Sequence, residues 1–360
     1  MKKMVCVLMA LAMLAGCSAP QPTAVAPSES PLAVAPTPTP SENVVIVVET
    51  PKPQMEDYNI LEGYSPTTGL PSQKGYKPVL VAIANESGAR PQWNISLADI
   101  VYEIEVEGSM TRLAALYNDN TPDKTGPIRS ARVNFFDIAK EWDGILAHYG
   151  GPDAGNGAPS GADIKIKRSQ LGFETSVNGM SVGKLFKRDS ARRAPSNVYA
   201  SVTELQQHFD YTPKPHAMMF DLNGSVKQEG DAALSVTLDL RAGGKVAYEY
   251  DTDSGVYARS VGGKKFSDGV TGEQLSFSNI IVQKAAHSRI SGSDKHIGVK
   301  LIGEGEAVYY IDGVAIKGKW RRDDIDDRTH YLDEDGNLLY LKPGKTVIHI
   351  TREDVGITIK

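Results

Sequence analysis

The stretch IVYEIEVE, residues 100–107, alternates apolar and acidic side chains through its second half. Side chains of a β-strand point to opposite faces in turn, so this stretch predicts a half-buried strand. Its apolar face carries Tyr102, Ile104 and Val106, and its other face carries three carboxylates: Glu103, Glu105 and Glu107. Three neighbouring carboxylates repel one another unless cations lie among them. The nearest basic residues along the chain are Arg112, Arg129 and Arg132.

Two interpretations of this acidic face are open. It is either a solvated surface that is partly paired with the three arginines, or one wall of a polar cleft. In the cleft, the acids and guanidiniums face each other and one arginine remains for a ligand's carboxylate or phosphate.

The segment TGPIRSARVNFFDIAKEW, residues 125–142, predicts a helix beginning near Pro127, because proline suits the first helical turn. Arg129 and Arg132 would then lie in the first two turns, beside the positive end of the helix dipole. That arrangement forms an anion site, filled either by Glu103 or Glu107 or by a ligand. We expect Arg132 to be paired internally and Arg129 to face the ligand.

Further candidate residues follow this helix. His148 ends the predicted strand GILAHY, residues 144–149, directly before the glycine-rich loop 150–161, which suits a lid or a ligand contact. A structural role for His148 is the alternative. The basic segment 185–201 is either a solvated loop or folds back so that Arg193 and Asn197 close the cleft. The candidate ligand-binding residues are therefore Glu103, Glu107, Arg112, Arg129, Arg132, His148, Arg193 and Asn197.

The pattern of elements predicts an α+β fold. Strands and helices mix in an N-terminal α/β domain, residues 57–222, which includes a helix that begins with the capping box Ser201–Glu204. Helical periodicity then disappears, and short strands separated by turns predict a mostly antiparallel β domain over residues 228–355. These strands are SVTLDL, KVAYEY, VYARSV, NIIVQK, IGVKLI, AVYYID and TVIHIT.

The N-terminus predicts export and lipid anchoring. Residues 1–16 form a signal peptide, and Leu14-Ala15-Gly16-Cys17 matches a lipobox, which makes Cys17 the lipidated residue. Residues 17–56 are rich in proline and predict a disordered tether, apart from the apolar run Val44–Val48, which is a docking strand or a chance apolar patch. We therefore expect a protein anchored in the cell membrane, on its extracytoplasmic face.

Composition excludes several kinds of chemistry. The two cysteines, Cys6 and Cys17, belong to the signal peptide and the lipid anchor, so disulfides and cysteine-ligated zinc are not expected. HExxH, GxSxG and SxxK motifs are absent, and the glycine-rich loop lacks the helix that a dinucleotide or P-loop site requires. We expect neither a metal nor a cofactor. A net charge of −5 disfavours nucleic acid as a partner.

Several motifs in order resemble those of the YerB-like lipoproteins, the DUF3048 family, which is catalogued as a domain of unknown function. They are ARPQWNISLADIVYEIEVEGSMTRLAALY, GPIRSAR, HYGG, RRAPSNVY, YDTDSGVYAR, NIIVQ, GKW and LKPGKTVIHI, within residues 75–352. The resemblance implies two domains and an envelope-lipoprotein setting without a settled activity. The chain departs from the family at Ser196, where a histidine is usual, and between Lys265 and Asp268, where a His-x-Asp pattern has lost its histidine.

Three functional hypotheses follow, and enzymatic activity is left open. The first is a binding or accessory lipoprotein whose cleft holds an anionic or sugar-like ligand of the cell envelope. The alternative is a hydrolase of an envelope polymer that uses paired carboxylates, because neighbouring acids on one strand face approach the separation of a glycosidase pair. The third is a protein scaffold that uses the β domain.

Overall fold

The computed structural model describes residues 61–107, 110–151, 171–241, 244–290 and 296–360. The predicted signal peptide, Cys17, the tether with Val44–Val48 and residues 152–161 of the glycine-rich loop lie outside these ranges. Thr50–Lys360 belong to one compact unit.

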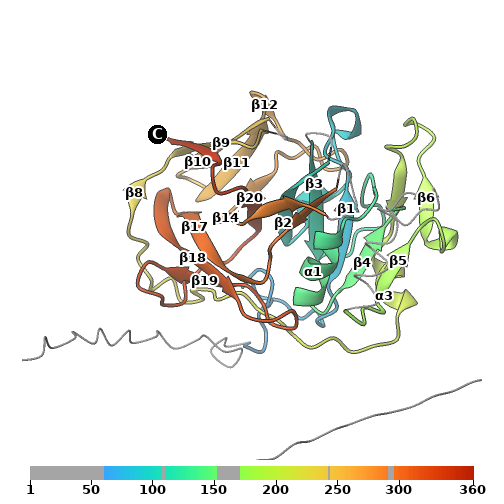
Figure 1. The fold of residues 1–360 in the computed structure, drawn as a ribbon, viewed down its shortest axis with the longest axis horizontal. Coiled ribbons are helices and arrows are strands. Elements are labelled where there is room, and N and C mark those ends of the chain that lie inside the picture. The colour runs from blue at the N-terminus through green and yellow to red at the C-terminus, as the bar shows by residue number, and fades with distance from the viewer. Residues whose placement is uncertain (1–60, 108–109, 152–170, 242–243, 291–295) are drawn as a thin grey trace, which may run out of the picture. The chain divides into compact units, whose positions relative to one another are not determined.

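A large mixed sheet organises this unit (Figure 1). Within the described ranges it contains 11 strands. In spatial order they are β19 (His330–Asp333), β18 (Val314–Arg322), β17 (Gly303–Ile311), β14 (Asn279–Lys284), β20 (Thr346–Thr351), β2 (Ile100–Val106), β3 (Met110–Tyr117), β1 (Val79–Ile83), β4 (Ile145–His148) and β5 (Ser176–Asn178), with β8 (Asp231–Ala232) on β18.

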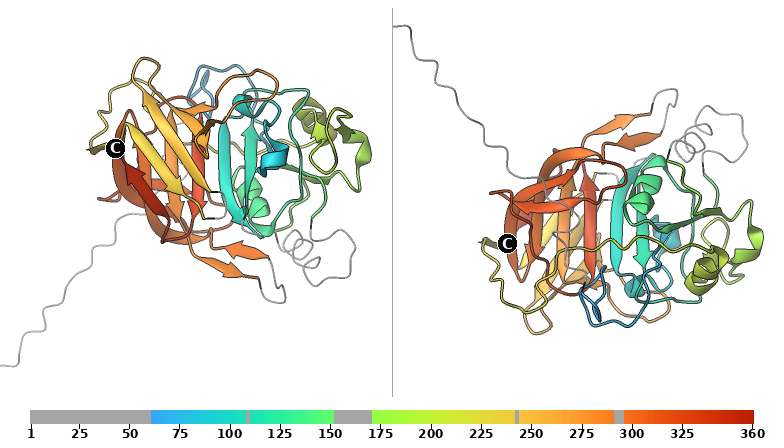
Figure 2. Two further views of the ribbon diagram at one scale, coloured as in Figure 1. Left: turned by 90° about the horizontal axis from the view of Figure 1, so that it is seen from above. Right: turned by 90° about the horizontal axis from the view of Figure 1, so that it is seen from below.

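A smaller antiparallel sheet lies against the C-terminal half of the large one, as Figure 2 shows for its yellow strands. Its strands are β12 (Lys264–Lys265), β11 (Val256–Val261), β10 (Lys245–Asp251), β9 (Ser235–Asp239) and β21 (Gly356–Ile359), with β13 (Ser276–Phe277) on β11. Two hairpins complete the strands: β15 (His287–Arg289) with β16 (Ile297–Val299), and β6 (Phe186–Arg188) with β7 (Val198–Ala200). The helices are α1 (Val133–Glu141) and α3 (Val202–His208), with short 3-10 turns η2 (Ser87–Ala89), η3 (Ile95–Leu97) and η4 (Gly183–Leu185).

From β14 to β5, six strands of the large sheet point in one direction. β14, β20 and β2 are parallel neighbours, β3 reverses the direction, and β1, β4 and β5 are again parallel. All six therefore end at the same side of the sheet, which we call its carboxyl end. In open α/β sheets this is where ligands bind.

The two faces of the large sheet bury separate cores. On one face, residues of β1, β2 and β3 pack with the smaller sheet and with α3. On the other face, α1 covers the sheet through Phe135, Ile138, Ala139 and Trp142, which are at most 1% exposed. The predicted apolar face of α1 is thereby confirmed, because residues spaced three and four apart lie on one side of a helix.

The α+β class is confirmed, with more strand than helix. One feature was not foreseen. β20, from the C-terminal segment, pairs in parallel with β2, from the N-terminal segment, so a single sheet contains strands of both. Two domains divided near residues 222–228 remain a proposal.

The predicted start of the first helix is wrong. α1 begins at Val133, and Arg132 is its N-cap residue with an extended backbone. The preceding residues are held in extended form because their backbone groups bond to three other segments. Ile128 N–H donates to Val198 O, Arg129 N–H donates to Ala82 O, and Arg129 O accepts from Tyr149 N–H. Arg129 therefore lies between the ends of β1 and β4.

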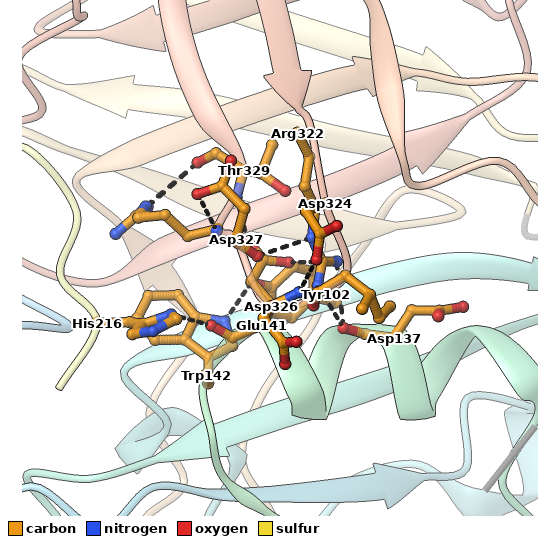
Figure 3. A network of polar contacts seen from close by, with 12 residues as sticks. Tyr102, Asp137, Glu141, Trp142, His216, Arg322, Asp324, Asp326, Asp327 and Thr329 are labelled. Atoms are coloured by element: carbon orange, nitrogen blue, oxygen red, sulfur yellow. Dashed lines mark hydrogen bonds and ion pairs between the residues drawn. The ribbon is translucent and has the colours of Figure 1, made fainter. Parts of the chain in front are cut away.

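The C-terminal end of α1 is fixed by a buried arginine (Figure 3). The fully buried Arg322, at the end of β18, donates to Asp137 O at 3.2 Å and to Ile325 O at 2.6 Å. Its Nη1 lies 3.5 Å from Glu141 Oε2, and Glu141 Oε1 accepts from Thr329 N–H at 2.8 Å. A cation near a helix C-terminus is favourable, so these contacts attach α1 to the β18–β19 loop.

Replacing this arginine tests the attachment. We expect Arg322→Met to lower the free energy of unfolding by about 3 kcal/mol, because Glu141 and the carbonyls would lose a buried cation. Its neighbour Arg321 pairs with the partly exposed Asp323, so Arg321→Met should cost less than about 1 kcal/mol. Urea denaturation measures both values. Equal losses for the two variants would contradict the structural role of Arg322.

Candidate functional site

Two arginines meet at the carboxyl end of the large sheet, and we call Arg112, Arg129 and the adjacent Glu86 the arginine site. Arg112 lies near the start of β3, and Glu86 follows β1 by three residues. The bonds of the Arg129 backbone to Ala82 and Tyr149 place it beside them. The three side chains thus come from three segments that only the sheet brings together.

The charges in the arginine site do not balance. Arg112 is 4% exposed and donates through Nη1 to Ser130 O at 2.6 Å, whereas its buried Nε has no hydrogen-bond partner. Burial and the nearby Arg129 lower the pKa of Arg112 to about 10, and Glu86 acts in the opposite direction. Glu86 Oε1 lies 3.5 Å from Arg129 Nε. Among the residues that the structure describes, two guanidiniums therefore share one carboxylate.

Arg132 has an internal partner, as expected. Its Nε donates to Glu107 Oε2 at 2.6 Å, and its Nη2 forms a second bond to Glu107 Oε1. Both side chains are mostly buried, with 11% and 18% exposed. A bidentate arginine–carboxylate pair is geometrically specific and strong. Arg132 and Glu107 therefore act on each other and not on a ligand.

Glu103 lies in a buried polar network between the two sheets. Its Oε2 accepts from Arg259 Nη2 at 2.5 Å, and its Oε1 accepts from Asn85 Nδ2 at 2.9 Å and from Thr111 Oγ1 at 2.6 Å. Arg259 Nη1 also donates to Tyr248 OH at 2.8 Å. The side chains of Glu103 and Arg259 are each 1% exposed. These contacts offset part of the cost of burying an ion pair, although the buried Arg259 Nε has no hydrogen-bond partner among the described residues.

His349 completes this network in its neutral form. Tyr248 OH accepts a hydrogen bond from Arg259 Nη1, so its own hydrogen is directed to His349 Nε2 at 2.7 Å. The imidazole hydrogen is then on Nδ1, which lies 3.5 Å from Glu103 Oε2 without a hydrogen bond among the described residues. Burial lowers the pKa of His349 to about 4, although Glu103 opposes the shift. Burial would raise the pKa of Glu103, but Arg259 and His349 outweigh it and lower that pKa to about 2.

The predicted site residues do not line one surface. In the pairing of β2 with β3, Arg112 lies opposite Ile104, and Glu103 lies opposite Leu113. Because paired residues share a face, Glu103 points toward the smaller sheet and Arg112 toward the face that α1 covers. The expected pairing of the glutamates with Arg112 and Arg129 is therefore wrong, and only Arg132 takes part.

Glu105 is engaged by another arginine of the C-terminal segment. Arg352, directly after β20, donates through Nε to Glu105 Oε2 at 2.7 Å and through Nη2 to Oε1 at 3.0 Å. Each of the three glutamates that the sequence places on one strand face therefore has its own arginine.

His148 has structural contacts. It is 2% exposed, its Nδ1 lies 2.7 Å from Gly150 O, and its Nε2 lies 3.2 Å from Ser176 Oγ. The ring also meets Phe136 edge-on. These contacts hold the end of β4 against β5 and α1.

Asn197 and Arg193 have different surroundings. Asn197 is 8% exposed, accepts from Arg188 Nη1 at 2.7 Å and donates to Asp189 O and Arg192 O, so it holds the loop between β6 and β7 together. Arg193 is exposed on the same loop. Only Arg193 of this pair is available to a ligand.

The described ranges contain no group of three or more His, Cys, Asp or Glu side chains placed to hold a metal ion. None of the helices within them is long and apolar enough to cross a membrane.

The sequence missed several residues of these networks, namely Glu86, Tyr248, Arg259, His349 and Arg352. Two of these residues could have been recognised in the sequence as buried and paired. Arg259 and His349 interrupt the apolar strands β11 and β20, and a buried charge inside an apolar strand needs a partner. No pattern identified which partner, because the pairs are separated by up to 247 positions.

The fold and the arginine site define an α+β protein with a mixed central sheet and an unbalanced cationic site at its carboxyl end. The chain belongs to the DUF3048 family, described as a protein of unknown function. Its N-terminal model matches residues 67–214 and its C-terminal model matches residues 236–348.

Two comparisons support this membership. The chain is 30% identical to "Putative lipoprotein YerB" of Bacillus subtilis (strain 168) over 298 residues, which covers 79% of this chain and 85% of that protein. It also resembles the crystal structure of the YerB protein from Bacillus subtilis, with a TM-score of 0.70 and 28% identity, over 82% of this chain and 99% of that one. The predicted family is thereby confirmed.

The unequal pairing of the two arginines predicts unequal effects on stability. Arg132→Ala should lower the melting temperature by about 2–5 °C, because it leaves the mostly buried Glu107 uncompensated. Arg129→Ala should leave the melting temperature unchanged or raise it, because it relieves the repulsion with Arg112. Thermal melts followed by circular dichroism measure both. A larger loss for Arg129→Ala than for Arg132→Ala would refute this assignment.

The buried network predicts acid sensitivity. Unfolded His349 takes up a proton near pH 6.5, whereas folded His349 does so near pH 4, so stability should fall as the pH drops through this window. The loss is on the order of 3 kcal/mol. Glu103 adds a further loss at lower pH, because its folded pKa is also depressed.

Urea denaturation at several values between pH 7 and pH 4 measures this loss. His349→Gln should be less stable at pH 7 but should show a smaller decrease on acidification. The exposed His208 supplies the control, and His208→Gln should keep the wild-type profile. An unchanged pH profile in His349→Gln would exclude the proposed role.

Proposed function

We propose that this chain is an extracytoplasmic lipoprotein, anchored through Cys17, that binds an anionic group of a cell-envelope ligand at the arginine site. The membrane setting rests on the Leu14–Cys17 lipobox and on the lipoprotein named among its relatives. The binding role rests on charge and burial around Arg112 and Arg129.

The unbalanced charge of Arg112 carries this proposal. A buried guanidinium without a carboxylate partner is costly, and the nearby Arg129 adds repulsion. A phosphate or carboxylate placed between them would receive charge-assisted hydrogen bonds from both planar groups. The free protein bears this cost before the ligand arrives, which is the arrangement of a preorganised binding site.

The position of the arginine site in the fold also supports anion binding. The arginine site lies where β1 and β4 end in parallel, and backbone atoms of Arg129 tie the two ends together. Ligands of open α/β sheets bind at such ends. Glu86 occupies one side of the site, and Ser196 Oγ donates to it at 3.4 Å. A stronger anion would displace Glu86 from Arg129.

The contacts of the glutamates do not favour a hydrolase with paired carboxylates. Glu103 is buried and ionised with a pKa of about 2, so it holds no proton to donate at neutral pH. Glu105 and Glu107 are engaged by Arg352 and Arg132. We therefore do not propose this activity.

Calorimetric titration with inorganic phosphate tests the site. Arg129→Gln should weaken phosphate binding at least tenfold, because it removes one of the two guanidiniums. Glu86→Gln should strengthen binding several-fold, because it removes the internal competitor. Arg321→Gln, which removes an arginine paired with Asp323, is the matched control and should bind as the wild type does. Equal phosphate affinity in the Arg129→Gln variant and the wild type would rule the site out.

A further inference from the structure

We infer that the ligand of the arginine site is a linear polymer with repeated negative groups, which continues from Arg129 over the loop between β6 and β7. This inference rests on the proposed function and adds the class of ligand. The positive charge of that loop comes from Arg188, Arg192 and Arg193, which would extend the binding surface beyond Arg129.

The loop adjoins the arginine site at two points. Arg188 Nη2 donates to Tyr149 OH at 3.2 Å, and its guanidinium lies 5.1 Å from the centre of the Tyr149 ring. The N–H of Tyr149 in turn donates to Arg129 O. On the other side, Ser196 of the loop donates to Glu86. Tyr149 therefore contacts both residues, Arg188 through its hydroxyl group and Arg129 through its backbone.

The acid of this loop, Asp189, does not neutralise its cations: it lies near enough to Arg192 to interact with it, but it is bonded to another residue. Asp189 pairs with Lys124 at 2.6 Å, and Lys187 pairs with Glu204 at 2.9 Å. Arg188, Arg192 and Arg193 form no ion pair with any residue that the structure describes. They place an excess of positive charge on one loop of a chain whose net charge is −5.

Two of these arginines are held in fixed positions. Arg188 Nη1 donates to Asn197 Oδ1, and Arg192 donates to Ala89 O and to Pro91 O while it stacks 4.2 Å from the centre of the Trp93 ring. An arginine in solvent samples many rotamers, whereas the side chains of Arg188 and Arg192 are already restricted by their contacts. Binding a ligand to them therefore costs less conformational entropy. Each guanidinium has five N–H donors and keeps some for a ligand.

A single anion requires only Arg112 and Arg129. The loop that adjoins that pair carries three more guanidiniums, and cations that lie close together repel one another. Only a ligand with several negative groups compensates all of them at once. We assign a polymer with phosphate or carboxylate groups along its length, since guanidinium binds both.

Binding to the full chain is measured with long-chain inorganic polyphosphate, with inorganic phosphate and with poly-glutamate. Polyphosphate should bind at least tenfold more tightly than phosphate, and its affinity should fall steeply with salt. Comparison with poly-glutamate distinguishes phosphate from carboxylate polymers. Tighter binding of a single-stranded oligonucleotide than of either polymer would overturn the assignment in favour of nucleic acid.

Variants distinguish binding at the loop between β6 and β7 from binding at the arginine site. Arg193→Gln and Arg188→Gln should each weaken polyphosphate binding several-fold and reduce the salt slope by about 0.7, and both should bind phosphate as the wild type does. Arg129→Gln should weaken both ligands. Arg193 is exposed, and its side chain makes no hydrogen bond or ion pair with the part of the chain that the structure describes, so its variant remains informative if Arg188→Gln fails to fold. Arg289→Gln, at another exposed arginine, is the control.

The outcomes distinguish this inference from the proposed function. If phosphate binds through Arg129 but polyphosphate binds no more tightly, the polymer assignment is wrong and the single-anion site stands. If Arg129→Gln affects neither ligand, both are wrong.

Discussion

The ion pair between Glu103 and Arg259 is the contact on which the rest of the structure depends. It joins β2 of the large sheet to β11 of the smaller sheet, and both side chains are 1% exposed. Removing either partner would leave a buried charge, so the two sheets are held in one arrangement. Tyr248, Asn85 and Thr111 bond to most of the remaining donors and acceptors of the pair, which lowers the cost of burying it. Arg259 Nε and His349 Nδ1 are buried without a hydrogen-bond partner among the described residues.

This pairing also determines the charge at the carboxyl end of the sheet. Arginines from the C-terminal segment neutralise two of the three glutamates that follow one another along β2, Glu103 by Arg259 and Glu105 by Arg352. Arg132 neutralises the third, Glu107. No glutamate of this row is left for Arg112 and Arg129, and among the described residues Glu86 is the carboxylate that lies beside them. The positive charge of the arginine site is therefore not compensated by this row of glutamates.

Stability and the proposed binding are assigned to different arginines in this molecule. Arg259 and Arg322 are buried with carboxylates and carbonyls, and they fix the smaller sheet and α1 in place. Arg188, Arg192 and Arg193 lie on a loop whose own acid is taken by Lys124. Residues of the same type therefore differ in role because their surroundings differ in burial and in the supply of carboxylates.

The sequence by itself determined the apolar face of α1, the cap of α3, the family, and which side chains of β2 share a face. The apolar face of α1 and the Ser201 cap of α3 follow from spacing within a few residues, where backbone geometry decides which side chains meet. Only the tertiary structure decided that α1 begins after Arg132, because Ala82, Tyr149 and Val198 take the backbone bonds of residues 128–129. It alone also decided which arginine meets which glutamate. Charge attraction is not specific to a partner, and the pairs form between residues up to 247 positions apart, so sheet order and register select them.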